Sequence, residues 1–214
     1  MTPELAGRLL IASPHLSDGN FFRSVILMVR HDHEGAFGII VNRPTERRFR
    51  DLVDEASWAA SGGGSIREDD HVLHGGPVPG PLLAIHDIAG IGQPCGSEGE
   101  PMTAEWADVP AEPFGALDLS FDPSPIWITG DDDHLRILAR RTDAKVRFVL
   151  QYSGWGPGQL DQEYRRGGWL SGPADLGVVF SDEDDIWELA VKRCGQDILE
   201  SMRPGMDFGD PNLN

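Results

Sequence analysis

The chain has 214 residues, of which 40% are hydrophobic and 25% are charged, a composition typical of globular domains. These values predict one soluble domain that folds on its own. The formal charge of −17 repels a phosphate backbone, so generic nucleic-acid binding is disfavoured.

The longest apolar segments are too short to cross a membrane. Val25–Val29 and Phe37–Val41 fall far below the roughly 20 residues that a membrane helix needs. Met1–Leu10 lacks the apolar core of a secretory signal, so we expect a cytoplasmic protein with no membrane partner. Two cysteines, Cys95 and Cys194, are too few for a disulfide scaffold or a four-cysteine zinc site.

The first part of the chain alternates short apolar runs with turn formers. Glu34-Gly35 predicts a hairpin turn between two strands. Apolar residues recur at helical spacing from Phe49 to Ala56 with charges between them, which predicts an amphipathic helix over Glu46–Ala60. The strands predicted here are Gly7–Ser13, Ser24–His31 and Ala36–Val41.

Short strands and surface loops continue through the rest of the chain. Residues 61–70 and 87–114 are predicted to be surface loops, and a short helix is predicted over Gln159–Arg166. Acids at Asp131–Asp133 predict the start of another helix, and Ser181 is predicted to cap the last helix. The strands predicted here are His71–His74, Leu82–His86, Ala116–Phe121, Ile126–Thr129, Val146–Tyr152 and Gly177–Phe180.

The order of these elements is typical of an α+β protein, because strands arrive in groups rather than in strict alternation with helices. We predict a single compact domain over residues 1–202. It would hold a mixed, largely antiparallel sheet of complex topology with a few flanking helices. Residues 203–214 are predicted to be a mobile C-terminal tail.

Five segments, in order along the chain, resemble the YqgE/AlgH family, also known as UPF0301 or DUF179. The resemblance implies an α+β fold of complex topology and a bacterial cytoplasmic location. It implies no agreed activity, cofactor or catalytic residue, although one branch carries the label of transcriptional regulator of alginate production. The matching segments are GRLLIASPHLSDGNFFRSVILMVRH from Gly7, GAFGIIVNRP from Gly35, HGGPV from His74, GWGPGQLDQE from Gly154, and Trp169-Leu170.

Glycine-rich turns with polar neighbours are the candidate binding features. The turn at His74-Gly75-Gly76 is similar to an esterase oxyanion loop, but no G-x-S-x-G supplies a nucleophile, so a backbone bend is the favoured interpretation. The glycines of Gly154–Gly158 precede a helix, which suits either a structural corner or a small-anion or peptide site. Their spacing matches neither a Rossmann turn nor a P-loop.

We predict a surface that binds a partner or small ligand where the Asn42-Arg43 strand end, the His74 turn and the Gly154–Glu163 corner combine. Whether these segments share one cleft is left open. Gln159 and Glu163 are four residues apart and are expected to share a helix face. The candidate residues are Asn42, Arg43, His74, Gly75, Gly76, Trp155, Gln159 and Glu163.

No cofactor, metal or catalytic residue is predicted, and the leading hypothesis is a non-enzymatic protein that binds an unknown protein or small ligand. His31 and His33 would share a strand face, yet no further ligand motif accompanies them. One alternative is a hydrolase or transferase that uses His74 or His86 as its base. Another is a regulator that contacts DNA directly, which the acidic charge disfavours. The arginines of segment 43–50 are interpreted as partners in helix-face ion pairs.

Overall fold

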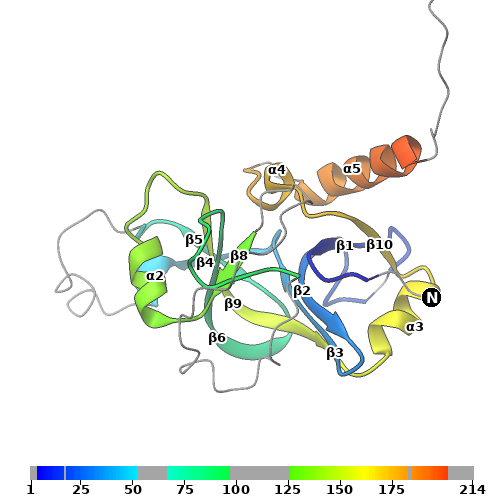
Figure 1. The fold of residues 1–214 in the computed structure, drawn as a ribbon, viewed down its shortest axis with the longest axis horizontal. Coiled ribbons are helices and arrows are strands. Elements are labelled where there is room, and N and C mark those ends of the chain that lie inside the picture. Colours follow the sequence, from blue (N-terminus) through cyan, green and yellow to red (C-terminus); the bar gives the residue numbers. More distant parts are fainter. Residues whose placement is uncertain (1–3, 17, 53–66, 97–125, 183–184, 202–214) are drawn as a thin grey trace, which may run out of the picture.

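A computed structural model describes residues 4–16, 18–52, 67–96, 126–182 and 185–201 (Figure 1). Within these ranges, no helix has both the length and the apolar character needed to cross a membrane. The helices are η1 (Phe49–Asp51), a 3-10 helix, α2 (Asp132–Leu138), α3 (Gln159–Arg165), α4 (Leu176–Val179) and α5 (Ile186–Ser201).

One curled sheet of ten strands joins the described parts of the chain. Its main path runs β10-β1-β2-β3-β9-β6-β8-β7, while β5 pairs with both β9 and β4. Every pairing is antiparallel except that of β5 with β9, which confirms the predicted mixed, largely antiparallel sheet in a single compact α+β domain. The strands are β1 (Arg8–Ala12), β2 (Val25–Asp32), β3 (Gly35–Ile40), β4 (Pro44–Arg48), β5 (His71–His74), β6 (Val78–His86), β7 (Gln93–Pro94), β8 (Trp127–Thr129), β9 (Val146–Trp155) and β10 (Trp169–Pro173).

Strand β9 connects the two halves of the sheet because it pairs with three different strands. Its last residues pair with β3, placing Trp155 opposite Ala36. Its earlier residues lie between β5 and β6, where Val149 is opposite both Leu73 and Leu83. The strand is therefore paired on both sides at Val149 and Leu150.

Both faces of the β1–β3 region are buried, which explains its almost continuous apolar sequence. Alternate residues of a strand face opposite sides, so Leu9 and Ile11 belong to one core cluster and Leu10 to another. Helices α4 and α5 contribute to the first cluster, which also includes Cys194. Figure 1 shows α4 and α5 along the side of the molecule that holds β1 and β10, and α3 near the far end of β3.

A third core cluster lies where α2 packs on the other half of the sheet. Phe49 stacks on Phe148 with ring centroids 3.9 Å apart, and Leu135 and Leu138 of α2 join them. Figure 1 shows α2 at the end of the molecule opposite α3. The sheet is thus covered by different helices at its two ends.

The predicted helix over Glu46–Ala60 is wrong in its described part. Residues 44–48 form β4, which pairs with β5, and residues 49–51 form only the short helix η1. Phe49 is fully buried against Phe148, so its contacts across the sheet decide the local structure rather than helical periodicity. The expected helix-face ion pairs are replaced by a contact between Arg50 and Asp69 at 2.7 Å. Residues 53–60 lie outside the described residues.

The predicted strand over Gly177–Phe180 is also wrong, because these residues overlap α4. Asp175 caps this helix by accepting a hydrogen bond from the Gly177 N–H at 2.6 Å. The cap of α5 is Asp185 rather than Ser181, since its carboxylate accepts from the Glu188 N–H at 3.0 Å.

Two other boundaries differ from prediction. Strand β6 begins at Val78 rather than at Leu82, and β7 lies within the segment predicted to be irregular. The predicted strand Ala116–Phe121, most of the two loop predictions and the predicted tail fall outside the described residues.

Candidate binding surface

A tight turn between β1 and β2 links the segments that the sequence singles out. We call residues 18–23 the Phe22 turn. Asp18 closes it, because its carboxylate accepts from the Asn20 N–H at 2.7 Å and its carbonyl accepts from the Phe22 N–H at 2.8 Å. The Phe22 side chain projects outward and is 57% exposed. In the described part of the chain, Ile137 is the other large hydrophobic residue that is exposed.

Asn42 and Arg43, at the end of β3, hold one side of the Phe22 turn. The Asn42 amide accepts from the Val25 N–H at 2.9 Å and donates to the Arg23 carbonyl at 2.8 Å. The Arg43 guanidinium donates to the carbonyl oxygens of Asn20 and Phe22. Burial lowers the pKa of Arg43, and nearby Asp18 opposes that effect. The two predicted binding residues therefore brace the backbone of the turn.

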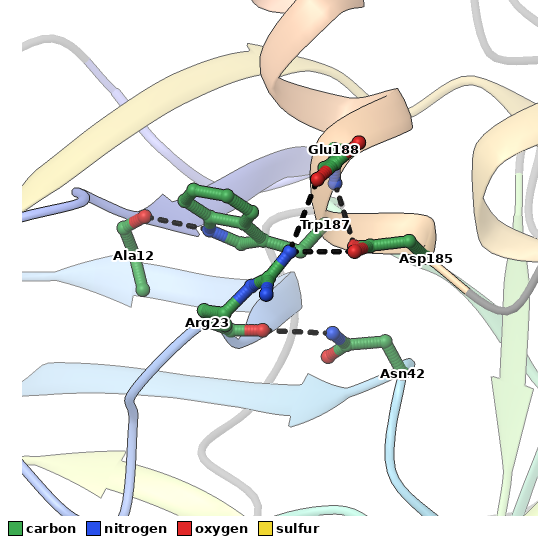
Figure 2. Close-up of polar contacts among 6 residues, drawn as sticks. All are labelled: Ala12, Arg23, Asn42, Asp185, Trp187 and Glu188. Carbon is green, nitrogen blue, oxygen red and sulfur yellow. Dashed lines mark hydrogen bonds and ion pairs between the residues drawn. The ribbon is translucent and has the colours of Figure 1, made fainter.

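Arg23 fastens the same turn to α5 (Figure 2). Its guanidinium lies 2.5 Å from the Asp185 carboxylate, 3.4 Å from that of Glu188 and 4.7 Å from the Trp187 ring centroid. The Trp187 indole N–H in turn donates to the Ala12 carbonyl at 2.8 Å. We call Arg23, Asp185, Trp187 and Glu188 the Arg23 latch.

Arg23 has a φ of 52°, which is uncommon for a residue other than glycine. The bond from Asn42 to its carbonyl and the contacts of the Arg23 latch hold it in this conformation. Sequence reasoning missed the latch, because Arg23 and Asp185 are 162 residues apart and no local pattern joins them.

The α3 corner holds a second set of predicted residues in a closed network. The Glu163 carboxylate accepts indole N–H bonds from Trp155 at 3.1 Å and from Trp169 at 2.9 Å. It also accepts from the Gln159 side chain at 3.0 Å, so the expected shared helix face is confirmed. The Gln159 oxygen accepts from the Gly156 N–H at 3.2 Å. One backbone donor that an anion would need at this corner is therefore already occupied.

Phe21 connects this corner to the Phe22 turn. Its ring stacks on Trp155 with centroids 5.7 Å apart and meets the edge of Trp169 at 5.4 Å. The neighbouring carbonyls of Asn20 and Phe22 accept from Arg43. The structure thus brings the Asn42-Arg43 end and the Gly154–Glu163 corner together on opposite sides of one turn.

The His74-Gly75-Gly76 turn lies next to Arg43 and passes close to the backbone of β9. The His74 N–H donates to the Arg43 carbonyl at 2.8 Å. A Cβ at Gly75 would lie 2.4 Å from the Gln151 carbonyl oxygen, and one at Gly76 would lie 2.3 Å from that of Tyr152. Only glycine tolerates such close approach to β9, which supports the interpretation of this motif as a backbone bend.

His74 and His86 do not share a site, because β5 and β6 border β9 on opposite sides. His74 is opposite Leu150 of β9, whereas His86 is opposite Val146. His86 is fully buried, and burial lowers its pKa to about 4. Its Nδ1 accepts from the Ile88 N–H at 3.2 Å.

His31, near the end of β2, contacts an acidic residue of α3. His31 Nε2 lies 3.5 Å from the Asp161 carboxylate of α3, which ties these two elements together. Across the described ranges, no group of three or more histidine, cysteine or acidic side chains is arranged to hold a metal ion.

A surface hollow of about 420 Å³ opens next to the Phe22 turn and the end of α3. None of the eight predicted residues lines it. Sequence reasoning missed it because its walls come from two segments about 150 residues apart, neither of which carries a recognised ligand motif. The lining residues are Ser13, His15, Leu16, Asp18, Arg166, Gly167 and Gly168.

Comparison with known proteins places the chain in a family. The family model described as DUF179, AlgH-like, matches residues 9–199. The chain belongs to this family. A UPF0301 protein of Ruegeria pomeroyi is 36% identical over 201 residues, covering 92% of this chain and 95% of the relative. A UPF0301 protein of Streptomyces coelicolor is 34% identical over 214 residues, covering 98% of this chain and 95% of the relative.

Two solved structures share the fold. The solution structure of the AlgH protein from Pseudomonas aeruginosa matches with a TM-score of 0.58 at 20% identity, covering 93% of each chain. A crystal structure of a Corynebacterium diphtheriae protein matches with a TM-score of 0.58 at 19% identity, covering 90% of this chain and 88% of that one. The names of these relatives state no activity, and likeness at this identity extends to the fold alone.

Proposed function

We propose that this chain is a non-enzymatic cytoplasmic protein that binds a protein partner through the Phe22 turn. The observation that carries the proposal is a large apolar side chain, 57% exposed, on a turn that side chains brace from several directions. A rigid aromatic anchor loses little conformational entropy when a partner covers it. Burial of the ring then contributes to affinity.

The predicted polar residues support docking rather than chemistry. Asn42, Gln159 and Glu163 direct their side-chain polar atoms to other groups of the same molecule. A group committed in this way is a poor acid, base or nucleophile, but it fixes the shape of a surface. These residues would therefore act on a partner indirectly, by positioning the Phe22 turn.

The two alternatives have less support. The hydrolase or transferase alternative names His74 or His86 as the base. Of these two, His86 is a poor base, because its ring is fully buried and its pKa lies at about 4. Direct DNA binding conflicts with a charge of −17. A mobility-shift series would favour DNA binding if a complex formed at low salt and weakened steeply with added salt. A regulatory role for this chain would instead act through its protein partner.

Phe22 and Ile137 form a matched pair for the first experiment, since Ile137 is 45% exposed on α2. A photo-crosslinking amino acid is placed at position 22 or 137 of the full chain in cells of the source organism. We expect position 22 to capture a defined protein that position 137 does not. Identical products from both positions would contradict the proposal.

The second experiment measures affinity for the captured protein after purification of both components. We expect Phe22→Ser to weaken binding about tenfold or more, as loss of an aromatic anchor does, and Ile137→Ser to leave it unchanged. Arg43→Ala and Gln159→Ala should weaken binding to a smaller extent by loosening the braces. Unchanged affinity in Phe22→Ser, with thermal melting that shows a folded variant, would rule out this surface.

A further inference from the structure

The hollow beside the Phe22 turn contains ionisable groups that no interaction within the described residues explains. Among the arginines that the structure describes, only Arg166 and Arg47 have a guanidinium with no hydrogen-bond or ion-pair partner. Both side chains are exposed, and of the two only Arg166 lines the hollow, since Arg47 lies on β4. In a chain with 35 acidic and 18 basic residues, Arg166 is thus one of the few cations left available for a ligand.

Two further donors lie in the same wall. His15 is exposed, and its ring has no partner among the described residues. Ser13 is 6% exposed, and its hydroxyl oxygen accepts from the His15 N–H at 3.3 Å, which leaves the hydroxyl proton to donate. A guanidinium, an imidazole and a hydroxyl together suit an oxyanion, because guanidinium binds carboxylate and phosphate groups in a bidentate manner.

Asp18 is the acidic residue that lines the hollow, and its carboxylate already has two interactions of its own. The Asp18 carboxylate accepts from the Asn20 N–H at 2.7 Å and attracts the nearby Arg43 guanidinium. At the end of α3, the carbonyls of Tyr164 and Glu163 are paired with the N–H groups of Gly167 and Gly168. The Arg43 guanidinium partly offsets the charge of Asp18, so that the cationic Arg166 can attract an anion on the other wall of the hollow.

We propose that this hollow binds a small ligand through a carboxylate or phosphate group. Its volume of about 420 Å³ is within the range of small-molecule sites. Arg166 would hold the oxyanion, with His15 and Ser13 donating from the side and Leu16 contacting an apolar part of the ligand. The groups that would hold the ligand, Arg166, His15 and Ser13, differ from the side chains assigned to partner docking, and the two surfaces share only Asp18.

Titration calorimetry on the full chain tests the proposal with two probes, inorganic phosphate and succinate, at constant ionic strength. We expect saturable binding of at least one probe. Arg166→Gln should weaken that binding about tenfold or more, the effect of losing a charged hydrogen bond. The control is Arg47→Gln, which removes the same charge from the other unpaired arginine and should change affinity less than twofold.

The relative affinity of the probes distinguishes the ligand class, since tighter phosphate binding indicates a phosphorylated ligand and tighter succinate binding a carboxylate. Phe22→Ser should bind the probe like wild type, which separates this site from the docking surface. Absence of saturable binding with both probes would overturn the proposal. Equal weakening by Arg166→Gln and Arg47→Gln would also overturn it, because only net charge would then matter.

Discussion

Asn42 shows how a residue that looks suited to ligand recognition can serve the fold instead. Its side-chain amide accepts from the Val25 N–H and donates to the Arg23 carbonyl. These two bonds take the place of the backbone hydrogen bonds that a neighbouring strand would make to the start of β2. The sequence places a polar residue at a strand end but does not reveal its partners. Those partners are 17 and 19 residues away, and they depend on how the Phe22 turn closes.

His86 supplies a prediction at the same scale, through the dependence of stability on pH. Its pKa is about 4 in the folded chain, below the ordinary value of 6.5, because burial disfavours the charged ring. The unfolded chain therefore takes up a proton first as the pH falls. The contribution of His86 to stability should be constant above pH 6.5, fall between pH 6.5 and 4, and be constant again below pH 4.

Replacement of His86 by Asn removes this titration while keeping an acceptor for the Ile88 N–H. Between pH 7 and pH 4, wild type should lose about 3 kcal/mol more free energy of unfolding than His86→Asn. Urea unfolding at both pH values measures the difference. His33→Gln, at an exposed position, is the control and should keep the wild-type loss. Equal losses in wild type and His86→Asn would show that His86 does not drive acid sensitivity.

Among the elements, the strands of the first 41 residues were predictable and the segment after them was not. Continuous apolar runs mark strands buried on both faces. The arginine-rich segment up to Arg48 has little apolar character, and its strand conformation comes from pairing with β5 and from the contact of Thr45 with the Val72 carbonyl at 2.7 Å. Hydrophobic periodicity cannot predict a strand of this kind, because pairing with another strand, rather than its own apolar pattern, determines its conformation.

The close contact between the His74-Gly75-Gly76 turn and β9 predicts that a side chain at Gly76 would destabilise the chain. A methyl group at Gly76 would meet the Tyr152 carbonyl at 2.3 Å, and the φ of 152° adds strain. Gly76→Ala should therefore destabilise the chain by about 3 kcal/mol or more, or prevent its recovery in folded form. Thermal and urea unfolding measure the effect.

Gly19→Ala is the matched control for this substitution. A Cβ at Gly19 meets nothing within 4 Å, and its φ lies outside the left-handed region. This variant should stay within about 0.5 kcal/mol of wild type. If Gly76→Ala proved as stable as Gly19→Ala, the glycine turn and β9 would have to be able to move apart at little cost in free energy.

For the whole molecule, excess negative charge should limit stability at low salt. The chain carries 35 acidic residues against 18 basic ones, and added ions screen their mutual repulsion. Raising NaCl from about 10 mM to about 0.5 M should therefore raise the melting temperature. Salt also weakens exposed pairs such as Arg23 with Asp185, but each contributes only about 1 kcal/mol or less.

Calorimetry or circular dichroism melting measures this shift. Sucrose, which carries no charge, is the control for effects other than screening, and the salt effect should saturate where the sucrose effect does not. A melting temperature that falls with NaCl would mean that ion pairs such as the Arg23 latch outweigh the general repulsion.

The fold class could be predicted from the sequence, whereas the order of strands in the sheet could not. Grouped strands and few helices indicate α+β. The pairing of β1 with β10 joins Arg8 to Pro173, and β5 meets β9 through Leu73 and Val149. Contacts between residues so far apart leave no local pattern. The hollow is hidden for the same reason, since Ser13 and Arg166 meet only after β10 reaches β1.

The pairing of β1 with β10 also has a consequence for biosynthesis. During translation β1 is made well before its outer neighbour β10 and the helix α5 that covers it. The nascent chain must therefore hold apolar β1 with one edge and one face uncovered until β10 and α5 have been synthesised. A chain of this topology depends on late residues to complete its earliest strand, so protection by a chaperone would be most valuable in that interval.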